Sequence, residues 1–364
     1  WMANRIINLL NLLGLAIAVA TFYLFMTQVI YNRTYNHNIE GHENMYSFEI
    51  QGGIFGDNWG CQICRPFVTM LKDIPQVEDV TYLCAYINEI NVKIDQRDVS
   101  VPWISMGKPG IEFFTGRPLS GTSKTWDDKS STAIVSESTA KKMFGTANAT
   151  GKTFLVDFNN KSRLFTVVGV SKDMPDNCTL PNGVYLCDNE QGLTNWEEWS
   201  FNIYVRFVKG TDATQMARAL KLAFMKANNI SDEKQFDKEV NMKFRFTPVD
   251  NIYFSGIGMK DKGNRNLVYV LTVASIFILF IAMLNLLNFS LSTIPMRMRG
   301  INTRRVMGAS VGHLRLNIVM ENVGFSVVAF VIGILLIVAF QRSETCMKLV
   351  SGDIHFATHA TLTA

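Results

Sequence analysis

Residues 267–291 read LVYVLTVASIFILFIAMLNLLNFSL, an apolar stretch that carries no charged side chain. A helix rises about 1.5 Å per residue and the hydrocarbon core of a bilayer is about 30 Å thick, so about 20 such residues cross it. Leu, Ile, Val, Phe and Ala also dominate residues 6–31 and residues 316–341. The sequence therefore predicts an integral membrane protein with three α-helical transmembrane spans.

The first apolar stretch has a signal peptide as its alternative interpretation. Residues 11–31 carry no charge, and the stretch is longer than the apolar region of a typical signal peptide. No small-x-small cleavage site closes it, and Tyr31 and Tyr35 suit a membrane interface. We therefore expect a permanent anchor within residues 1–31.

The orientation of the spans follows from residues 292–315, which contain no Asp or Glu and five arginines: Arg297, Arg299, Arg304, Arg305 and Arg315. Short loops rich in Lys and Arg stay in the cytoplasm. This segment is too short and too close to the spans to predict a nucleic-acid partner. We expect residues 292–315 and the N-terminus inside the cell, and residues 32–266 outside the cytoplasm.

Together these arguments divide the chain of 364 residues, whose net charge is +4. The overall composition, 48% hydrophobic and 18% charged, averages over apolar spans and a globular insert. Residues 342–364 are too polar for a fourth span, so the chain is expected to end before a further span. The predicted segments are 1–31 (span 1), 32–266 (extracytoplasmic domain), 267–291 (span 2), 292–315 (cytoplasmic basic segment), 316–341 (span 3) and 342–364 (extracytoplasmic tail).

Polar side chains inside the predicted spans are the next candidates for function. Asn285 and Asn288 lie near the far end of span 2, where amides usually bond to a neighbouring helix, with substrate contact as the alternative. Glu321 and Asn322 are expected in the first turn of span 3, whose start is placed near residue 318. A carboxylate there meets the positive end of the helix dipole, and intramembrane acids are functional candidates.

Residues 32–266 alternate between strand and helix patterns. Residues 136–144 begin with capping residues and carry an apolar face, which predicts a helix. Asp212 precedes a second helical pattern at 213–228. Runs of β-branched and aromatic residues predict strands at 130–135, 164–170, 201–208, 243–249 and 251–254. The predicted fold class is therefore a large α+β extracytoplasmic domain inserted between spans 1 and 2.

The cysteines permit more than one interpretation. Outside the cytoplasm, disulfides persist, so structural disulfides or buried thiols are expected among Cys61, Cys64, Cys84, Cys178 and Cys187. The single pair Cys61-Gln-Ile-Cys64 lacks the second pair that a zinc site needs and the βαβ context of a thioredoxin-type site. A redox or metal role is the less favoured alternative.

Other chemical motifs are weak. Gly151-Lys152-Thr153 resembles the end of a P-loop, but Thr146 stands where that loop has a glycine, so a polar turn that opens a strand is preferred. The five histidines are scattered, and His355 and His359 lack a third ligand. No nucleophile elbow is present, so no catalytic residue and no metal site are predicted.

Residues 297–310 read RMRGINTRRVMGAS, and Glu321 follows in span 3. The first piece is similar to the RxKEIGIRKVLGAS segment of MacB/FtsX-like ABC-transporter permeases, particularly the Bacteroidota type, and Glu321 matches a Glu of that family in span 3. The similarity covers nearly the whole chain. Its further pieces are NLLGLAI (11–17), YNHN (35–38), NMY (44–46), AIVSESTAKKMFG (133–145), GKT (151–153), FTVVGV (165–170) and DMP (173–175).

The resemblance implies a permease subunit that is not itself an ATPase and binds no cofactor, with ATP and Mg²⁺ on a partner ATPase. The implied location is the bacterial inner membrane, with the large domain in the periplasm. Its implied partners are an ABC ATPase, a second permease copy or half, and a periplasmic adaptor or outer-membrane protein. Export or mechanotransmission would start at ATPase-coupling residues Arg297, Arg299, Arg304, Arg305, Gly308, Ala309 and Ser310.

The chain departs from the family at Gly300, where Glu is usual, and at Asn302, where Gly is usual. These differences affect the expected ATPase contact. The arginines could instead only fix topology and bind anionic lipid. A membrane-anchored receptor or sensor is the alternative function, and an anchored extracytoplasmic enzyme is disfavoured because no catalytic pattern is present.

Overall fold

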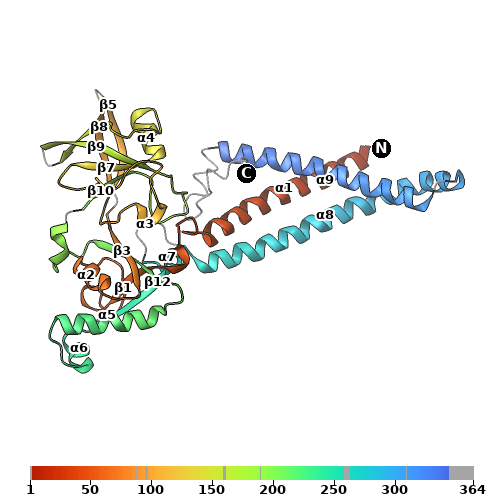
Figure 1. The fold of residues 1–364 in the computed structure, drawn as a ribbon. Coiled ribbons are helices and arrows are strands. Elements are labelled where there is room, and N and C mark those ends of the chain that lie inside the picture. Colours follow the sequence, from red (N-terminus) through yellow and green to blue (C-terminus); the bar gives the residue numbers. More distant parts are fainter. Residues whose placement is uncertain are drawn as a thin grey trace. The chain divides into compact units, whose positions relative to one another are not determined.

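The computed structural model describes residues 2–86, 88–94, 97–158, 161–188, 190–257, 263–308 and 310–343. The chain forms two compact units (Figure 1). One is the domain Thr34–Gly263, and the other is a helical unit that comprises Trp1–Arg33 and the chain from Asn264 onward.

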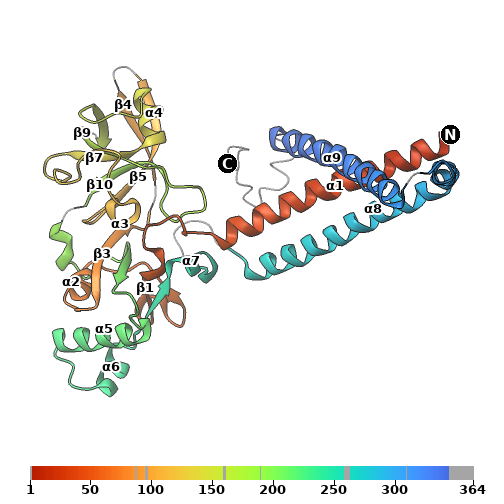
Figure 2. The same ribbon diagram turned by 45° about the vertical axis from the view of Figure 1, so that its right-hand side comes forward.

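The helical unit consists, within the described residues, of α1 (Met2–Arg33), α8 (Arg265–Val306) and α9 (Val311–Arg342). Each helix is long and apolar enough to cross a membrane. Helix α1 packs along both α8 and α9, as both views show (Figures 1 and 2). Small residues permit this approach, because a methyl group at Gly333 would lie 3.1 Å from the carbonyl oxygen of Ala16.

The described residues of the domain form one mixed sheet of 12 strands. Six of them, β10, β7, β9, β8, β4 and β5, make a closed ring, because β10 also pairs with β5. Strands β3, β11, β1 and β12 extend the sheet from β5. The strands are β1 (Met45–Gln51), β2 (Trp59–Gly60), β3 (Val77–Cys84), β4 (Asn88–Ile94), β5 (Arg97–Met106), β6 (Ser120–Gly121), β7 (Thr132–Ser136), β8 (Thr153–Phe158), β9 (Lys161–Ser171), β10 (Val184–Cys187), β11 (Phe201–Phe207) and β12 (Lys243–Pro248).

Short helices pack beside this sheet, and the extension formed by β3, β11, β1 and β12 has a hydrophobic core separate from that of the ring. Phe67 packs against Phe48 of β1 and against Phe224, which in turn packs against Phe236 in the same buried cluster. Each fully buried Phe stabilises the fold by about 1.5–3 kcal/mol. A separate cluster that includes Phe154 and Phe165 belongs to the ring. The helices are α2 (Pro66–Lys72), α3 (Glu112–Thr115), α4 (Glu137–Phe144), α5 (Ala213–Ala227), α6 (Glu233–Glu239) and α7 (Val249–Ser255), with 3₁₀ turns η1 (His42–Asn44), η2 (Gly53–Phe55) and η3 (Glu190–Thr194).

The predicted fold class is confirmed: an α+β domain lies between the first and second apolar helices. The predicted helices are confirmed where a capping residue begins them. Ser136 caps α4 by accepting from the backbone N–H of Thr139, and Gly145 ends it with φ +71°. Asp212 caps α5 in the same way. Strands β7, β9, β11 and β12 occupy the runs predicted as strands.

The strand predicted at 251–254 was wrong, because these residues belong to helix α7. Pro248 precedes the helix and Gly256 ends it with φ +72°. The buried Ile252 and Tyr253 contribute to the core beside Val249. Residues 251–254 are only four in number, three of them apolar or aromatic, which is too few for periodicity to distinguish a strand from one turn of helix.

Candidate functional site

The α8–α9 turn is where the sequence predicted ATPase coupling. The expected loop at 292–315 is mostly helical, since α8 continues to Val306 and α9 begins at Val311. Gly308 has φ +91°, a conformation that disfavours side chains. Ser310 then caps α9 by accepting from the backbone N–H of His313 at 3.3 Å. We define the α8–α9 turn as residues 306–310.

The α8–α9 turn is characterised by apolar side chains that are exposed to solvent. The side chains of Val306 and Met307 are 90% and 83% exposed, although both are apolar. Arg315, in the early part of α9, is also exposed. Arg297, Arg299, Arg304 and Arg305 lie on the last turns of α8, but their side chains, like all of Ala309, fall outside the described residues.

The two departures from the family pattern lie inside α8. Gly300 is within the helix rather than at its end, where a glycine costs about 1 kcal/mol relative to alanine. The side chain of Asn302 is outside the described residues. The backbone of α8 nevertheless remains helical through both positions.

The polar residues predicted inside the spans occupy different environments. Asn285 packs on α1, because a methyl group at Gly14 would lie 3.1 Å from its Nδ2. Asn322 donates from Nδ2 to the hydroxyl of Ser290 at 3.3 Å, which joins α9 to α8. Asn288 and Glu321 are exposed on the helical unit.

The expected position of Glu321 and Asn322 in the first turn of their helix was wrong. Helix α9 begins at Val311, so both residues lie well beyond its first turn. The prediction placed the helix start at the onset of the apolar stretch, whereas the cap is Ser310. Because the dipole effect fades within one turn, it does not stabilise the Glu321 carboxylate.

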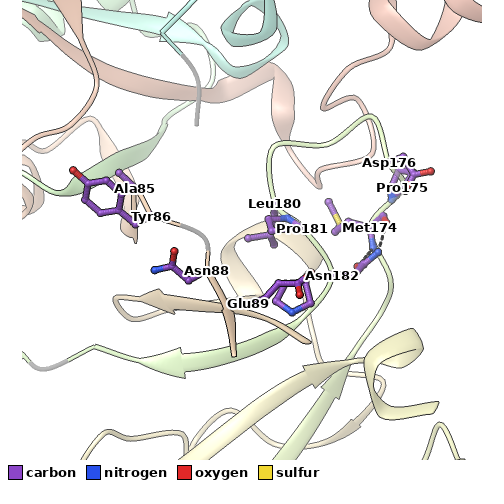
Figure 3. Close-up of a pocket in the computed structure, with 11 residues that line it drawn as sticks. Ala85, Tyr86, Asn88, Glu89, Met174, Pro175, Asp176, Leu180, Pro181 and Asn182 are labelled. Atoms are coloured by element: carbon purple, nitrogen blue, oxygen red, sulfur yellow. Dashed lines mark hydrogen bonds between the residues drawn. The ribbon is translucent and has the colours of Figure 1, made fainter. Parts of the chain in front are cut away.

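The domain contains a pocket of about 660 Å³ (Figure 3). The loop at 174–182 forms one wall, and Asn182 fixes it by bonding to both the backbone N–H and the carbonyl of Met174 at 2.8 and 2.7 Å. Residues of the β3–β4 connection face this loop across the cavity. The lining is Ala85, Tyr86, Asn88, Glu89, Pro102, Met174, Pro175, Asp176, Leu180, Pro181 and Asn182.

Among the described residues that line this pocket, the charged side chains are the carboxylates Glu89 and Asp176, and none is basic. Its size is within the range of small-molecule sites, and its mixed polar and apolar walls suit a polar or cationic group. The sequence did not indicate this pocket, because its two walls are distant in the chain and neither carries a motif.

The five described cysteines, Cys61, Cys64, Cys84, Cys178 and Cys187, are thiols and form no disulfide with one another. Burial raises the pKa of the Cys64 thiol to about 12, and burial also raises the pKa of Cys84. Because the thiolate is the reactive form, these environments favour inert structural thiols over a redox site.

The Gly151 segment is a turn that leads into β8, with φ +83° at Gly151, which agrees with the preferred interpretation. His355 and His359 lie outside the described residues. The histidines are less scattered in space than in sequence, because His37 and His42 meet at Asp250. Only the i, i+5 spacing of the two histidines was visible in the sequence.

Three long apolar helices, a basic segment between the last two and an α+β domain between the first two define a multi-span membrane protein with a large globular insert. The chain belongs to the MacB/FtsX-like permease family: a MacB-like periplasmic core domain matches residues 8–223, and an FtsX-like permease C-terminal domain matches residues 272–356. It is therefore a membrane protein with a periplasmic-type domain, of an ABC-transporter permease family whose members are not themselves the ATPase.

Solved structures similar to the chain include a permease domain from Porphyromonas gingivalis, with 20% identity and a TM-score of 0.47, covering 64% of this chain and 98% of that chain. The periplasmic region of MacB from Actinobacillus actinomycetemcomitans has 16% identity and a TM-score of 0.40, covering 59% and 92%. The extracellular domain of the ABC-type transporter YknZ from Gram-positive bacteria has 13% identity and a TM-score of 0.39, covering 56% and 100%. No curated protein matches the chain.

Proposed function

We propose that this chain is the permease subunit of an ABC transporter and that the α8–α9 turn binds the partner ATPase. The observation that carries the proposal is the exposure of Val306 and Met307, at 90% and 83%, within a strongly basic segment. Exposed apolar side chains beside arginines suit a protein surface with an apolar pocket and carboxylates, because arginine pairs with carboxylates in a bidentate manner. ATP and Mg²⁺ would bind the partner.

Helix α8 supplies a route for the coupling. It contains 42 residues, which corresponds to about 63 Å at about 1.5 Å per residue. The hydrocarbon core of a bilayer is about 30 Å thick, so one continuous helix extends well beyond it. We infer that a displacement of the α8–α9 turn moves α8 as a rigid body and so reaches the periplasmic domain, for export or mechanotransmission.

A second copy of the permease is part of this proposal. Asn288 is exposed among exposed apolar neighbours on α8, such as Leu284, Leu287 and Leu291. An amide that faces lipid is unfavourable, whereas helix–helix interfaces in membranes readily accept it. This position supports a contact between two permease copies.

The proposed orientation puts the chain in the bacterial inner membrane with the α8–α9 turn in the cytoplasm. Asn228 is exposed at the end of α5 and reports the location of the domain. The Asn228→Cys variant should react with a membrane-impermeant maleimide in intact spheroplasts. Labelling that appears only after lysis would contradict both the orientation and the ATPase contact.

The ATPase contact is tested with an affinity-tagged full-length chain purified from its native host. The double variant Arg304→Glu with Arg305→Glu should reduce the amount of copurified ATPase, identified by its Walker A motif, by about ten-fold or more. A ten-fold loss of affinity corresponds to about 1.4 kcal/mol of binding free energy. The matched control is Arg97→Glu with Arg117→Glu, since both arginines are exposed in the domain. Equal recovery from both double variants would show that the arginines of α8 serve topology or lipid binding.

The alternative function, a membrane-anchored receptor, is favoured by one observation, the pocket lined by Glu89 and Asp176. A receptor would bind its ligand there without any dependence on an ATPase. For a permease, the same pocket would receive a cargo or a periplasmic adaptor, and Glu89→Gln with Asp176→Asn would alter stimulation of the copurified ATPase. A variant that loses ligand binding with no change in ATPase stimulation would support the receptor.

A further inference from the structure

Three metal-binding side chains meet at one place in the domain. The Nδ1 of His42 lies 2.9 Å and 3.0 Å from the two carboxylate oxygens of Asp250. The Nε2 of His37 is 3.8 Å from Asp250 Oδ2. The candidate ligand atoms of all three residues lie within 4.8 Å of one another. Two imidazoles and a carboxylate therefore converge without any sequence motif.

The backbone on both sides of this cluster is held in place by buried contacts. Asn36 is fully buried, and its Nδ2 donates to the carbonyl of Val249 at 2.7 Å. Its Oδ1 accepts from the backbone N–H of Thr179 at 2.8 Å. The Tyr35 and Tyr253 rings stack with centroids 4.3 Å apart. The segment that carries the histidines is thus fixed to α7, which carries Asp250.

The side chains themselves remain accessible. The exposed fractions are 44% for His37, 21% for His42 and 29% for Asp250. An ion can therefore reach the three ligand atoms from solvent, and water can complete its coordination. This openness distinguishes the cluster from a buried ion pair that only supports the fold.

We propose that His37, His42 and Asp250 form a Zn²⁺ site that joins the segment after α1 to helix α7. Two imidazole nitrogens and one carboxylate oxygen, with water as the fourth ligand, are a common donor set for zinc. Tetrahedral zinc with bonds of about 2.0–2.1 Å needs ligand atoms about 3.3 Å apart. This separation lies between the distances of His42 and His37 from Asp250, which are 2.9 Å and 3.8 Å. The donor set excludes Mg²⁺ and Ca²⁺ as preferred ions, since these favour oxygen ligands.

Binding requires one rearrangement. The two imidazole rings are stacked, with centroids 4.8 Å apart and an interplanar angle of 15°. Zinc lies in the plane of each imidazole that binds it, so near-parallel rings cannot both bind one ion. His37 is the more exposed ring and has room to turn about its side-chain torsions, while Asp250 holds His42.

The position of the site in the chain indicates a structural role for bound zinc. The histidines follow α1, which ends at Arg33, and Asp250 is on α7, the last described helix before α8. Zinc would cross-link the two chain segments that connect the domain to its membrane helices. The proposal does not depend on an ATPase partner.

Zinc content and affinity of the full-length, detergent-solubilised chain test this site. We expect one Zn²⁺ per chain by metal analysis after dialysis, and saturable binding of ZnCl₂ by calorimetry. His42→Ala, His37→Ala and the isosteric Asp250→Asn should each weaken zinc binding by at least about ten-fold, since even outer-shell changes have effects of this size. Zinc should also raise the melting temperature of the wild type but not of these variants.

Matched controls remove other candidate ligands. His313→Ala, Cys61→Ser with Cys64→Ser, and His355→Ala with His359→Ala should all retain wild-type affinity. X-ray absorption of the zinc-loaded wild type should show two imidazole ligands, which remains informative where a variant folds poorly. Absence of zinc uptake by the wild type, or loss of uptake only in a control variant, would overturn the proposal.

Discussion

Asn322 of α9 donates a hydrogen bond from Nδ2 to the Oγ of Ser290 in α8 at 3.3 Å. The rings of Phe289 and Phe325 stack beside this bond, with centroids 3.7 Å apart. The Oδ1 of Asn322 is buried and has no hydrogen-bond partner among the described residues. This hydrogen bond and the aromatic stack therefore link the two helices in the segment that leads to the α8–α9 turn.

This contact should have a measurable but small energy. In a double-mutant cycle with Ser290→Ala and Asn322→Ala, we expect a coupling of about 0.6 kcal/mol, the average for such bonds in membrane bundles. Unfolding in mixed micelles measures the coupling. Strictly additive single variants would show that the bond does not stabilise the hairpin.

Gly308 should be essential to the α8–α9 turn for a conformational reason. Its φ of +91° is unfavourable for any residue with a Cβ, and strain at such positions is about 1–3 kcal/mol. Gly308→Ala should lower the melting temperature of the full chain and reduce ATPase copurification. Gly312 is a matched control, because it is in helix α9 and a Cβ added there would have open space around it. If Gly312→Ala has the larger effect, the turn does not depend on the backbone of Gly308.

Arg65 should be the most sensitive charged residue of the domain. It pairs with Asp188 at 2.5 Å and with Glu198, and only 8% of its side chain is exposed. Arg65→Met leaves two carboxylates without their partner, and we expect a loss of about 3 kcal/mol, the low end for a buried pair because Glu198 is 41% exposed. Urea unfolding measures this loss.

Lys93→Met provides the matched comparison for Arg65. Lys93 pairs with Asp157, but both side chains are about half exposed, at 50% and 42%. Pairs of this kind contribute little to stability. A similar loss in both variants would mean that burial does not determine the effect at Arg65.

Glu49 should make the stability of the domain depend on pH. Burial raises its pKa above the usual 4.5, although Arg245, whose Nε donates to Glu49 Oε2 at 2.5 Å, opposes the shift. A raised folded-state pKa gives a contribution that is full below the unfolded value and is lost as the pH rises through the folded value. Glu49→Gln has no charge to bury, so its stability relative to the wild type should increase as the pH rises from 4.5 toward neutrality.

The measurement for Glu49 is urea unfolding of the full chain across this pH range, with hydrogen exchange of β1 and β12 as a local probe. Arg245→Met should steepen the pH dependence, because it removes the opposing charge. A relative stability of Glu49→Gln that is flat or decreases with pH would contradict the burial argument.

Local signals in the sequence account for what could be predicted of the fold. The apolar stretches and caps such as Ser136 and Asp212 act over a few residues, so the spans, α4 and α5 were predictable. The closure of the ring depends on Val184 pairing with Trp103, which no local pattern encodes. The start of α9 at Val311 required recognition that Ser310 is a cap although polar residues follow it.

The candidate sites show the same division. The basic segment near Arg304 was visible because charge asymmetry is a property of composition. The pocket and the meeting of His42 with Asp250 arise from residues distant in the chain, 208 positions apart for that pair. Long-range packing brings them together, and a single sequence contains no direct record of it.

Strand β5 connects the ring to the rest of the sheet. At its end, Met106 pairs with Cys187 of β10 and also with Leu83 of β3. If β5 separated from the sheet, both the ring and the extension formed by β3, β11, β1 and β12 would have an unpaired strand edge. The periplasmic-type domain should therefore melt as one cooperative body, and a force applied to one half is borne by backbone hydrogen bonds in both.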